Sequence, residues 1–566
     1  MFLARTLWAA FWISSLALAE TNKTIKILGA NLVEPDIEKQ TWNWGPDSRC
    51  RLLAHQSIVV NYKGKELLLF DGGLAKFNYQ RNGEYFEVLE LNPRTVIIDL
   101  SKPFTSRDFI PISQLKKPLG VPVVNRFGLW EGANQGSILM QGGHFYDAED
   151  WRNSSYWLEK KDIPQYSIWK YDLDTSTWTE VPLPTNKSSF KRGFGGAAVS
   201  VPSTNQSYYI GGLWTPRSSN DSLDGLAVPL SGMLVYNHTA GTLTNESFGE
   251  TGMAYWHGSA NHLKIGKKDG FLIALMAETG PGGVPIKDDP VINDEHGSSL
   301  SFRYVMLYDL DNKKWINQST TFYNGEVPVS RTRFCGQTVY SRETKTWELW
   351  VHGGMLMEPL GEAAPDTWVL TMPSFIWTRV EMPDSVVRMR SHTCNAVGSQ
   401  LLIIGGYPPS AQVEKNATCD PELIKVVDMN TMTSGSHYTP GTVYKTPELV
   451  RKNAEFHLNR VDPQSGWADD ELRDAFRHSI GDPPLSRGII AGIVVSVVVG
   501  LPLLVFVILC AIFKSLPKFQ WPPWKSAPVS HPRSPGPYPQ PPSPVPTERT
   551  FPAPQGPGAA GAGPPW

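Results

Sequence analysis

The chain has almost no net charge. Its 566 residues contain 52 Lys and Arg against 54 Asp and Glu, a formal net charge of −2 at pH 7. A surface that binds nucleic acid needs an excess of basic side chains, because contacts with the phosphates dominate the affinity. The sequence therefore gives no basis for a nucleic-acid partner.

The motifs of the common nucleotide-binding and hydrolytic enzymes are also missing. No P-loop, dinucleotide-binding fingerprint or nucleophile elbow stands where a strand leads into a helix. We therefore assign no catalytic residue, no cofactor-binding residue and no metal ligand from the sequence. Whether the protein is an enzyme stays open, with a non-enzymatic role favoured.

Glycine pairs recur along the chain. Five apolar runs end in Gly-Gly, and the second glycines are Gly73, Gly143, Gly212, Gly354 and Gly406. The interval between Gly212 and Gly354 is about twice the preceding one, and the segment 271–280 lies inside it as a copy without the glycine pair. Such a period predicts a repeat architecture.

A second motif follows each glycine pair. A Tyr-Asp dipeptide is followed, seven residues after the Tyr, by an aromatic residue, and the pattern persists in degraded form in the other repeats. The Asp suits a turn and the aromatic residue suits packing between sheets. The positions are Tyr171, Asp172 and Trp178; Tyr308, Asp309 and Trp315; Tyr236, Asn237 and Leu243; Leu370 and Trp377; and Val427, Asp428 and Ser434.

These patterns predict an all-β fold made of four-stranded sheets. Runs that are apolar throughout, such as 67–70 and 401–404, are typical of strands buried on both faces. Glycines at their ends allow a sharp turn and the close approach of a neighbouring aromatic ring. A β-sandwich with Gly-Gly turns is the alternative, but radial repeats of this kind favour a β-propeller.

The repeats resemble kelch repeats, and the chain is similar to the kelch-containing membrane proteins of filamentous fungi over residues 40–515. Further shared features are Arg333-Phe334-Cys335, the pair Cys394 and Cys419, the segment 444–447, and Gly466-Trp467. The resemblance implies a six-bladed kelch β-propeller, related in type to the central domain of galactose oxidase, over residues 20–445. The expected blades are 50–120, 121–187, 188–250, 251–325, 326–383 and 384–440.

A ring of blades has to close, and a strand from one terminus commonly completes the blade made by the other. We expect an N-terminal strand over 25–32 to close or cover the last blade. Residues 446–487 are expected to form a stalk with a short helix over 468–478, since acidic residues begin it and basic residues end it.

The two ends of the chain predict a membrane protein. Residues 1–19 read as a signal peptide with a small-x-small cleavage site. Residues 488–513 carry no charge, are long enough to span a bilayer, and are followed by Lys514 and Lys518. We therefore expect a single-pass type I membrane protein with an extracellular or lumenal propeller. The Pro-rich tail, 514–566, is expected to be disordered and cytoplasmic, with a possible cytosolic partner.

Sequons for N-glycosylation agree with that topology, because all of them precede the predicted span. They are Asn22, Asn153, Asn186, Asn205, Asn220, Asn237, Asn245, Asn317 and Asn416.

Four of the five cysteines precede the predicted span, and an even number in an oxidising compartment favours disulfides. We expect a bridge between Cys394, on the innermost strand of the last blade, and Cys419. Cys50 and Cys335 are the remaining candidate pair. The fifth cysteine, Cys510, lies in the predicted span.

Long irregular insertions between the glycine-pair strand and the next strand are expected to emerge on one face of the propeller. They cover 74–93, 144–166, 213–231 and 279–301. Recognition residues concentrate on loops that a rigid scaffold positions. The candidate residues for this ligand face are Trp151, Tyr156, Trp157 and Trp214; the alternative is that these aromatic side chains pack the loops onto the blades.

Two functions stay open. The first is a cell-surface or secretory-pathway interaction protein that binds a protein or glycan through this face. The second is a galactose-oxidase-like or metabolite-modifying accessory enzyme, which would need a metal at the channel. We interpret His55, His257 and His392 as one repeated position, structural rather than metal-binding. We also hypothesise that Arg51, Arg333 and Arg390 make the channel mouth attractive to anions.

Overall fold

The computed structural model describes Lys26–Ile27 and most of residues 49–479. The gaps within 49–479 are 82–83, 109–110, 147–155, 184–189, 223, 250–251, 288–296, 358–359, 383–388, 407–421 and 459–465. The described residues form a predominantly β structure, as the sequence predicts.

Six antiparallel sheets follow one another along the described part of the chain, each with its strands in sequence order. The first holds β3 (Gln56–Tyr62), β4 (Lys65–Asp71), β7 (Arg94–Asp99) and β9 (Ser113–Lys116). The second holds β10 (Gly128–Glu131), β11 (Ser137–Gln141), β12 (Ile168–Asp172) and β13 (Thr177–Val181). The third holds β14 (Ala197–Val201), β15 (Gln206–Ile210), β18 (Met233–Asn237) and β19 (Thr242–Glu246).

The remaining three sheets repeat the arrangement. The fourth holds β21 (Ser259–Leu263), β22 (Phe271–Leu275), β26 (Tyr304–Asp309) and β27 (Lys314–Ser319). The fifth holds β30 (Cys335–Ser341), β31 (Thr346–His352), β34 (Thr367–Met372) and β35 (Ile376–Val380), with β28 (Thr321–Phe322) added in parallel to β35. The sixth holds β36 (Thr393–Val397), β37 (Gln400–Ile404), β38 (Ile424–Asp428) and β39 (Thr433–Gly435).

The Tyr-Asp motif occupies the third and fourth strands of these sheets. Tyr171 lies opposite Trp178, and Tyr308 lies opposite Trp315. The degraded copies keep the same register, with Tyr236 opposite Leu243, Leu370 opposite Trp377 and Val427 opposite Ser434. Each acidic or amide residue closes the turn; for example, the amide groups of Asp174 and Thr175 donate to Asp172 Oδ1. The sequence interpretation of this motif is confirmed.

The glycine pairs join neighbouring sheets. The backbone N–H of Gly73, Gly143, Gly212 and Gly354 donates to a carbonyl just before the first strand of the next sheet, at 2.8–3.0 Å. Gly406 of the sixth sheet donates to Leu52, before the first sheet, at 2.8 Å. Each pair thus has a backbone carbonyl as a close neighbour, and at Gly72 the ring of Phe127 also lies close, as the sequence predicted.

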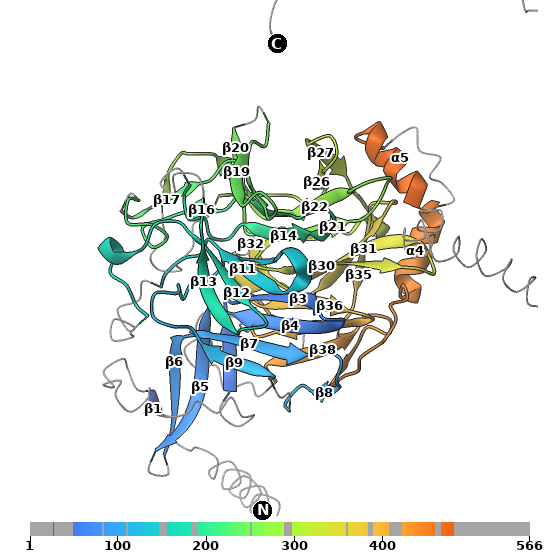
Figure 1. Cartoon of the computed structure of the whole chain (residues 1–566). Coiled ribbons are helices and arrows are strands. Elements are labelled where there is room, and N and C mark those ends of the chain that lie inside the picture. Colours follow the sequence, from blue (N-terminus) through green and yellow to red (C-terminus); the bar gives the residue numbers. More distant parts are fainter. Residues whose placement is uncertain are drawn as a thin grey trace, which may run out of the picture. The chain divides into compact units, whose positions relative to one another are not determined.

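First strands such as β3, β14, β21, β30 and β36 lie together at the centre, and outer strands such as β9, β13 and β27 lie at the periphery (Figure 1). Each first strand contacts that of the next sheet, in the order β3, β10, β14, β21, β30 and β36, and β36 contacts β3. The arrangement is that of a β-propeller.

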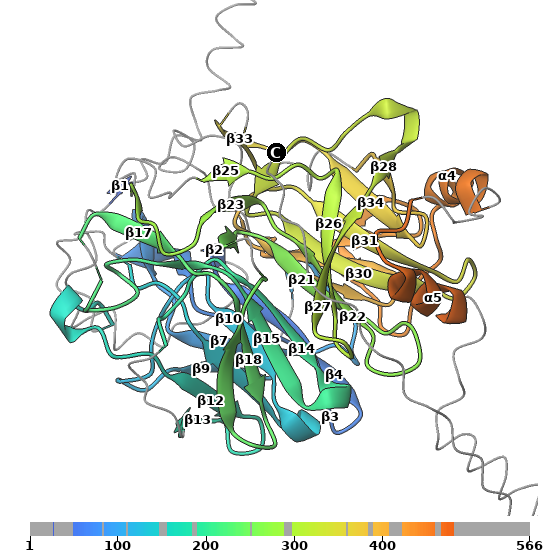
Figure 2. The ribbon, with the colours of Figure 1, turned by 90° about the horizontal axis from the view of Figure 1, so that it is seen from above.

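The predicted irregular insertions contain short strands. β2 (Arg49–Leu53) pairs with β5 (Leu74–Arg81), which pairs with β6 (Glu84–Leu91). Three more sheets of this kind form: β16 (Leu213–Trp214), β17 (Leu226–Pro229) and β24 (Ile286–Lys287); β20 (Met253–Trp256), β23 (Glu278–Pro281) and β25 (Ser298–Ser299); and β29 (Arg331–Thr332), β32 (Met355–Met357) and β33 (Leu360–Ala363). Figure 2 shows β17, β23, β25 and β33 on one side of the molecule. Strands of two of the predicted insertions, 213–231 and 279–301, thus lie on this side, and these insertions form short hairpins rather than irregular loops.

The N-terminal strand does not pair with the last sheet. β1 (Lys26–Ile27) runs parallel to β6, beside Phe86 and Glu87. The ends of the array are joined by β40 (His437–Tyr438), which pairs with β8 (Phe104–Thr105). The prediction that 25–32 closes or covers the last blade is wrong for the described Lys26–Ile27, because these residues pair with β6 of the first repeat and all four strands of the sixth sheet come from the last repeat itself.

Two helices follow the sheets. α4 (Glu448–Leu458) contacts β34 and β35. α5 (Asp470–Ser479) agrees with the predicted helix over 468–478, and Asp469 caps it by accepting from the amide groups of Glu471 and Leu472. Leu472 and Phe476 are buried in the core formed by the fourth and fifth sheets. The predicted stalk thus packs on the sheets.

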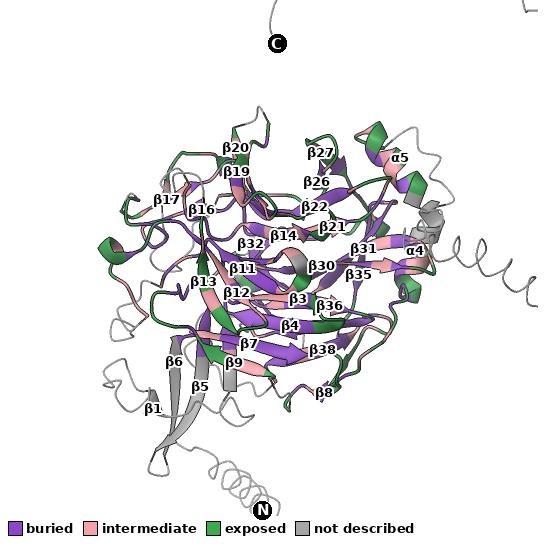
Figure 3. Ribbon diagram, in the orientation of Figure 1, coloured by how far each residue is buried: buried purple, intermediate pink, exposed green. Residues whose placement is uncertain are grey.

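Burial follows the position of a strand within its sheet. The side chains of β11, β22 and β37 are all buried, whereas β9 and β13 are partly exposed (Figure 3). Short 3-10 turns complete the described structure: η2 (Ala133–Gln135), η4 (Lys160–Asp162), η6 (Pro202–Thr204) and η7 (Tyr323–Gly325).

The prediction of a single-pass membrane protein is not supported. In the residues that the structure describes, no helix combines the length and the hydrophobicity needed to cross a bilayer. The segments that carried this prediction, 1–19, 488–513 and 514–566, lie outside the described residues.

Candidate functional site

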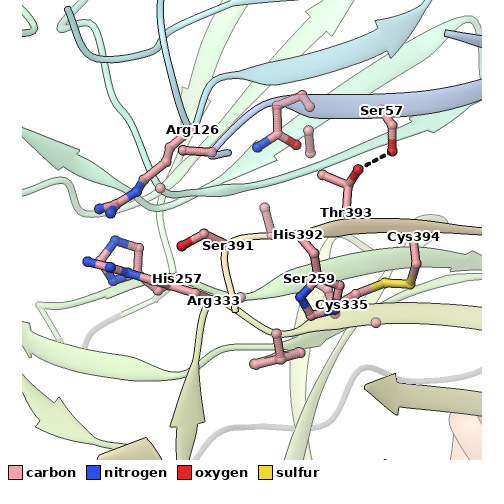
Figure 4. Close-up of a pocket in the computed structure, with 18 of the residues that line it drawn as sticks. Ser57, Arg126, His257, Ser259, Arg333, Cys335, Ser391, His392, Thr393 and Cys394 are labelled. Carbon is pink, nitrogen blue, oxygen red and sulfur yellow. Dashed lines mark hydrogen bonds between the residues drawn. A yellow bond between two sulfur atoms is a disulfide. The ribbon is translucent and has the colours of Figure 1, made fainter. Parts of the chain in front are cut away.

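A cavity of about 190 Å³ lies where the first strands of the six sheets begin. All six sheets contribute side chains to its lining. Figure 4 shows Arg126, His257 and Arg333 at one end of this cavity, and the disulfide between Cys335 and Cys394 at the other. The cavity lies on the side of the glycine pairs, because each first strand starts where its antiparallel second strand ends.

A ring of equivalent residues surrounds the charged end. Each lies two positions before a first strand and has a positive φ: Ala54, Arg126, Gly195, His257, Arg333 and Ser391. Five backbone hydrogen bonds of 2.6–3.2 Å link them from sheet to sheet, donated by Ala54, Arg126, Gly195, His257 and Ser391. The ring fixes the backbone from which the cationic side chains extend.

The two arginines of the ring come from the second and fifth sheets, and both are half-buried. Of the three arginines hypothesised from the sequence, only Arg333 lines the cavity. Arg51 donates to the carbonyl of Gly406 at 3.5 Å, and Arg390 contacts Met355 Sδ at 2.9 Å. The sequence missed Arg126, because no glycine or aromatic marker fixes the alignment of the repeats at the ring position.

His257 is held by a buried carboxylate. Its Nδ1 lies 2.9 Å from Glu278 Oε1, and both side chains are at most 3 % exposed. The indole N–H of Trp256 and the backbone N–H of Gly297 donate to Glu278 Oε2 at 3.2 and 3.0 Å. The pKa of His257 is lowered to about 4, mainly by burial. The hydrogen bond and the charge of Glu278 raise this pKa, and the charges of Arg126 and Arg333 lower it.

The other two histidines occupy a different position of the repeat. His55 and His392 lie one residue after the ring, so the predicted equivalence with His257 is wrong. His55 Nε2 lies 2.7 Å from Thr393 Oγ1, and burial lowers its pKa to about 3. The described residues contain no group of three or more His, Cys, Asp or Glu side chains placed to hold a metal ion.

A disulfide joins Cys335 at the start of β30 to Cys394 on β36 and thereby connects the fifth and sixth sheets. This corrects both predicted pairs, Cys394 with Cys419 and Cys50 with Cys335. Spacing along the chain suggested a bridge within one blade, whereas neighbouring first strands place the two cysteines at a Cα separation of 5.8 Å. Cys419 lies outside the described residues.

The predicted ligand-face aromatics are partly buried where they are described. Tyr156 and Trp157 pack against a cluster that includes Leu53 and Leu74, and the Tyr156 hydroxyl donates to the carbonyl of Lys117 at 2.8 Å. Lys191 Nζ lies 4.4 Å from the ring centre of Trp214. These contacts agree with the alternative that the aromatic side chains pack the loops; their part in binding stays a prediction. Trp151 lies outside the described residues.

The described sequons are accessible to different degrees. Asn205, Asn220, Asn245 and Asn317 are exposed, and Asn237 is half-buried with its Oδ1 accepting from the amides of Thr239 and Ala240. Asn22, Asn153, Asn186 and Asn416 lie outside the described residues. Glycosylation of these sites stays a prediction.

Comparison with known proteins gives one informative similarity. No family model matches the chain. A protein of Arthroderma benhamiae described as "Kelch repeat-containing protein" is 26% identical over 346 residues, which cover 56% of this chain and 48% of that protein. The chain thus spans about half the length of this curated relative. Together with the repeated sheets, this similarity to a kelch-repeat protein supports a β-propeller fold.

Proposed function

We propose that the six sheets are the blades of a closed kelch propeller that binds a partner protein or glycan. The binding face is the one on which the hairpins after the glycine pairs surround the axial cavity. The observation that carries the proposal is the convergence of Arg126, His257 and Arg333, from three different sheets, at one end of that cavity (Figure 4). A rigid scaffold with recognition side chains at its loop-bearing end is a common arrangement in binding proteins.

The scaffold supports this role because backbone contacts hold most of the cavity wall in place. The ring hydrogen bonds and the bridge between Cys335 and Cys394 hold neighbouring first strands together. A pre-formed site loses little conformational entropy when a ligand binds. No observation in the described part of the chain favours the oxidase alternative, which needs a set of metal ligands.

Arrays of glycans and peptides probed with the labelled full-length protein test this proposal. A ligand of the loop-bearing face should bind at least tenfold more weakly to Trp214→Ala, on β16, than to the unaltered protein. Lys267→Ala is the matched control, because exposed Lys267 lies in the turn between β21 and β22 at the opposite end of the sheets. Equal losses in both variants, or binding by neither array, would count against the proposal.

A further inference from the structure

The axial cavity has an unusual charge composition. The described residues that line it include Arg126 and Arg333 but no aspartate or glutamate. The other polar side chains of its wall are uncharged residues such as Ser57, Gln337 and Thr393. Two guanidinium groups in a half-enclosed space attract anions more strongly than they would at an open surface, because less water screens them.

The arginines act on the same end of the cavity. Both belong to the ring, and Figure 4 shows their side chains near His257. The charges of both arginines help to lower the pKa of His257. Planar guanidinium groups suit a carboxylate, since each can donate two parallel hydrogen bonds to it.

His257 supplies a group of the opposite kind. An ionised carboxylate can only accept hydrogen bonds, and Glu278 already accepts from Trp256 and Gly297. We assign the proton of this pair to His257 Nδ1, which then donates a hydrogen bond to Glu278 Oε1. With a pKa of about 4 the imidazole is neutral at pH 7, so its Nε2 has a lone pair. This Nε2 is buried and has no hydrogen-bond partner in the structure.

The geometry points to a specific ligand class: a small carboxylate that carries a hydroxyl group on the neighbouring carbon atom. Arg126 and Arg333 bind the carboxylate, and His257 Nε2 accepts a hydrogen bond from the hydroxyl group. The inference deepens the proposed function, because it rests on the cavity end of the propeller being the binding face. The volume fits a compact ligand, since a cavity of about 150 Å³ accommodates a six-carbon ring.

Calorimetric titration of the full-length protein with pairs of acids tests the inference. Malate and succinate differ only in the hydroxyl group, as do lactate and propionate. We expect the hydroxy acid of each pair to bind at least tenfold more tightly at pH 7, and both to weaken as salt is added. Equal affinity within each pair, no binding of any acid, or tighter binding of inorganic phosphate than of malate would overturn the inference.

Variants separate the two parts of the site. Arg126→Gln and Arg333→Gln should weaken the binding of malate and succinate at least tenfold, and Arg379→Gln, on the exposed side of β35, should not. His257→Phe should remove the preference for malate over succinate. If a glutamine variant of an arginine fails to melt cooperatively, the lysine variant at the same position, Arg126→Lys or Arg333→Lys, replaces it. If His257→Phe fails to melt cooperatively, Glu278→Gln replaces it. Unchanged affinity and preference in the folded variants would overturn the assignment.

The outcomes also distinguish this inference from the proposed function. Binding of malate without any array ligand would support the anion site and contradict the macromolecular partner. An array ligand that depends on Trp214, together with no binding of any of the acids, would support the partner and contradict the anion site.

Discussion

The strongest test of the fold is a single added methyl group at Gly211. Gly211 is the first residue of the third glycine pair and has a φ of +63°. A Cβ atom at this position would lie 1.9 Å from the carbonyl oxygen of Tyr255, on β20 just before the first strand of the fourth sheet. That same oxygen accepts the hydrogen bond from Gly212 at 2.8 Å.

Three costs add up in Gly211→Ala. The left-handed backbone costs about 1–2 kcal/mol for a residue with a Cβ atom. Inserting a methyl group where there is no space costs about 1–3 kcal/mol more. Moving Tyr255 away weakens its hydrogen bond with Gly212, at about 1 kcal/mol. We therefore expect a loss of roughly 3–6 kcal/mol in the free energy of unfolding.

Gly225→Ala is the matched control. Gly225 has nearly the same φ, +66°, but a Cβ atom there would meet no atom within 4 Å. Only the backbone term of about 1–2 kcal/mol remains. Urea unfolding followed by tryptophan fluorescence measures both variants. Equal losses in the two would show that the glycine pair is needed for its backbone angle alone, and would refute the proposed contact between sheets.

Three further predictions concern buried charges and the cross-link. Lys117→Met should lower the free energy of unfolding in urea by about 3–5 kcal/mol, because Lys117 and Asp71 form a fully buried ion pair at 2.5 Å. The double variant with Asp71→Leu should lose less than the sum of the two single variants, and additive losses would contradict the pairing. The free energy of unfolding should fall as the pH falls from about 6.5 towards 4, because five histidines have a pKa near 6.5 in the unfolded chain and a lower pKa in the fold. Each of them can lower the free energy of unfolding by up to about 1.4 kcal/mol per pH unit. Equal urea midpoints at pH 7.5 and 5 would contradict this. These histidines are His55, His144, His238, His257 and His392. Non-reducing peptide mapping should recover Cys335 linked to Cys394, and Cys335→Ser should lower the free energy of unfolding by about 2–5 kcal/mol; a peptide linking Cys394 to Cys419 would refute the pairing.

The repeats and the outer strands of each sheet could be predicted from the sequence. The glycine pairs marked the ends of the second strands, and the Tyr-Asp motif marked the turn between the third and fourth strands, where the structure then places Tyr171 opposite Trp178. These are local features: the alternation of strands and the chemistry of tight turns depend on residues close together in the chain. The helix over 468–478 was predictable for the same reason.

Which residues meet at the axis depends on how the sheets pack against one another. Arg126, His257 and Arg333 come from three sheets, and their ring position lacks a sequence marker, so a shift of one residue placed His55 and His392 in the wrong set. The link between Cys335 and Cys394 and the position of β1 beside β6 likewise depend on contacts between distant segments. Local patterns specify each sheet, but the first strands become neighbours only when the sheets pack around a common centre. That packing creates the cavity and its charge.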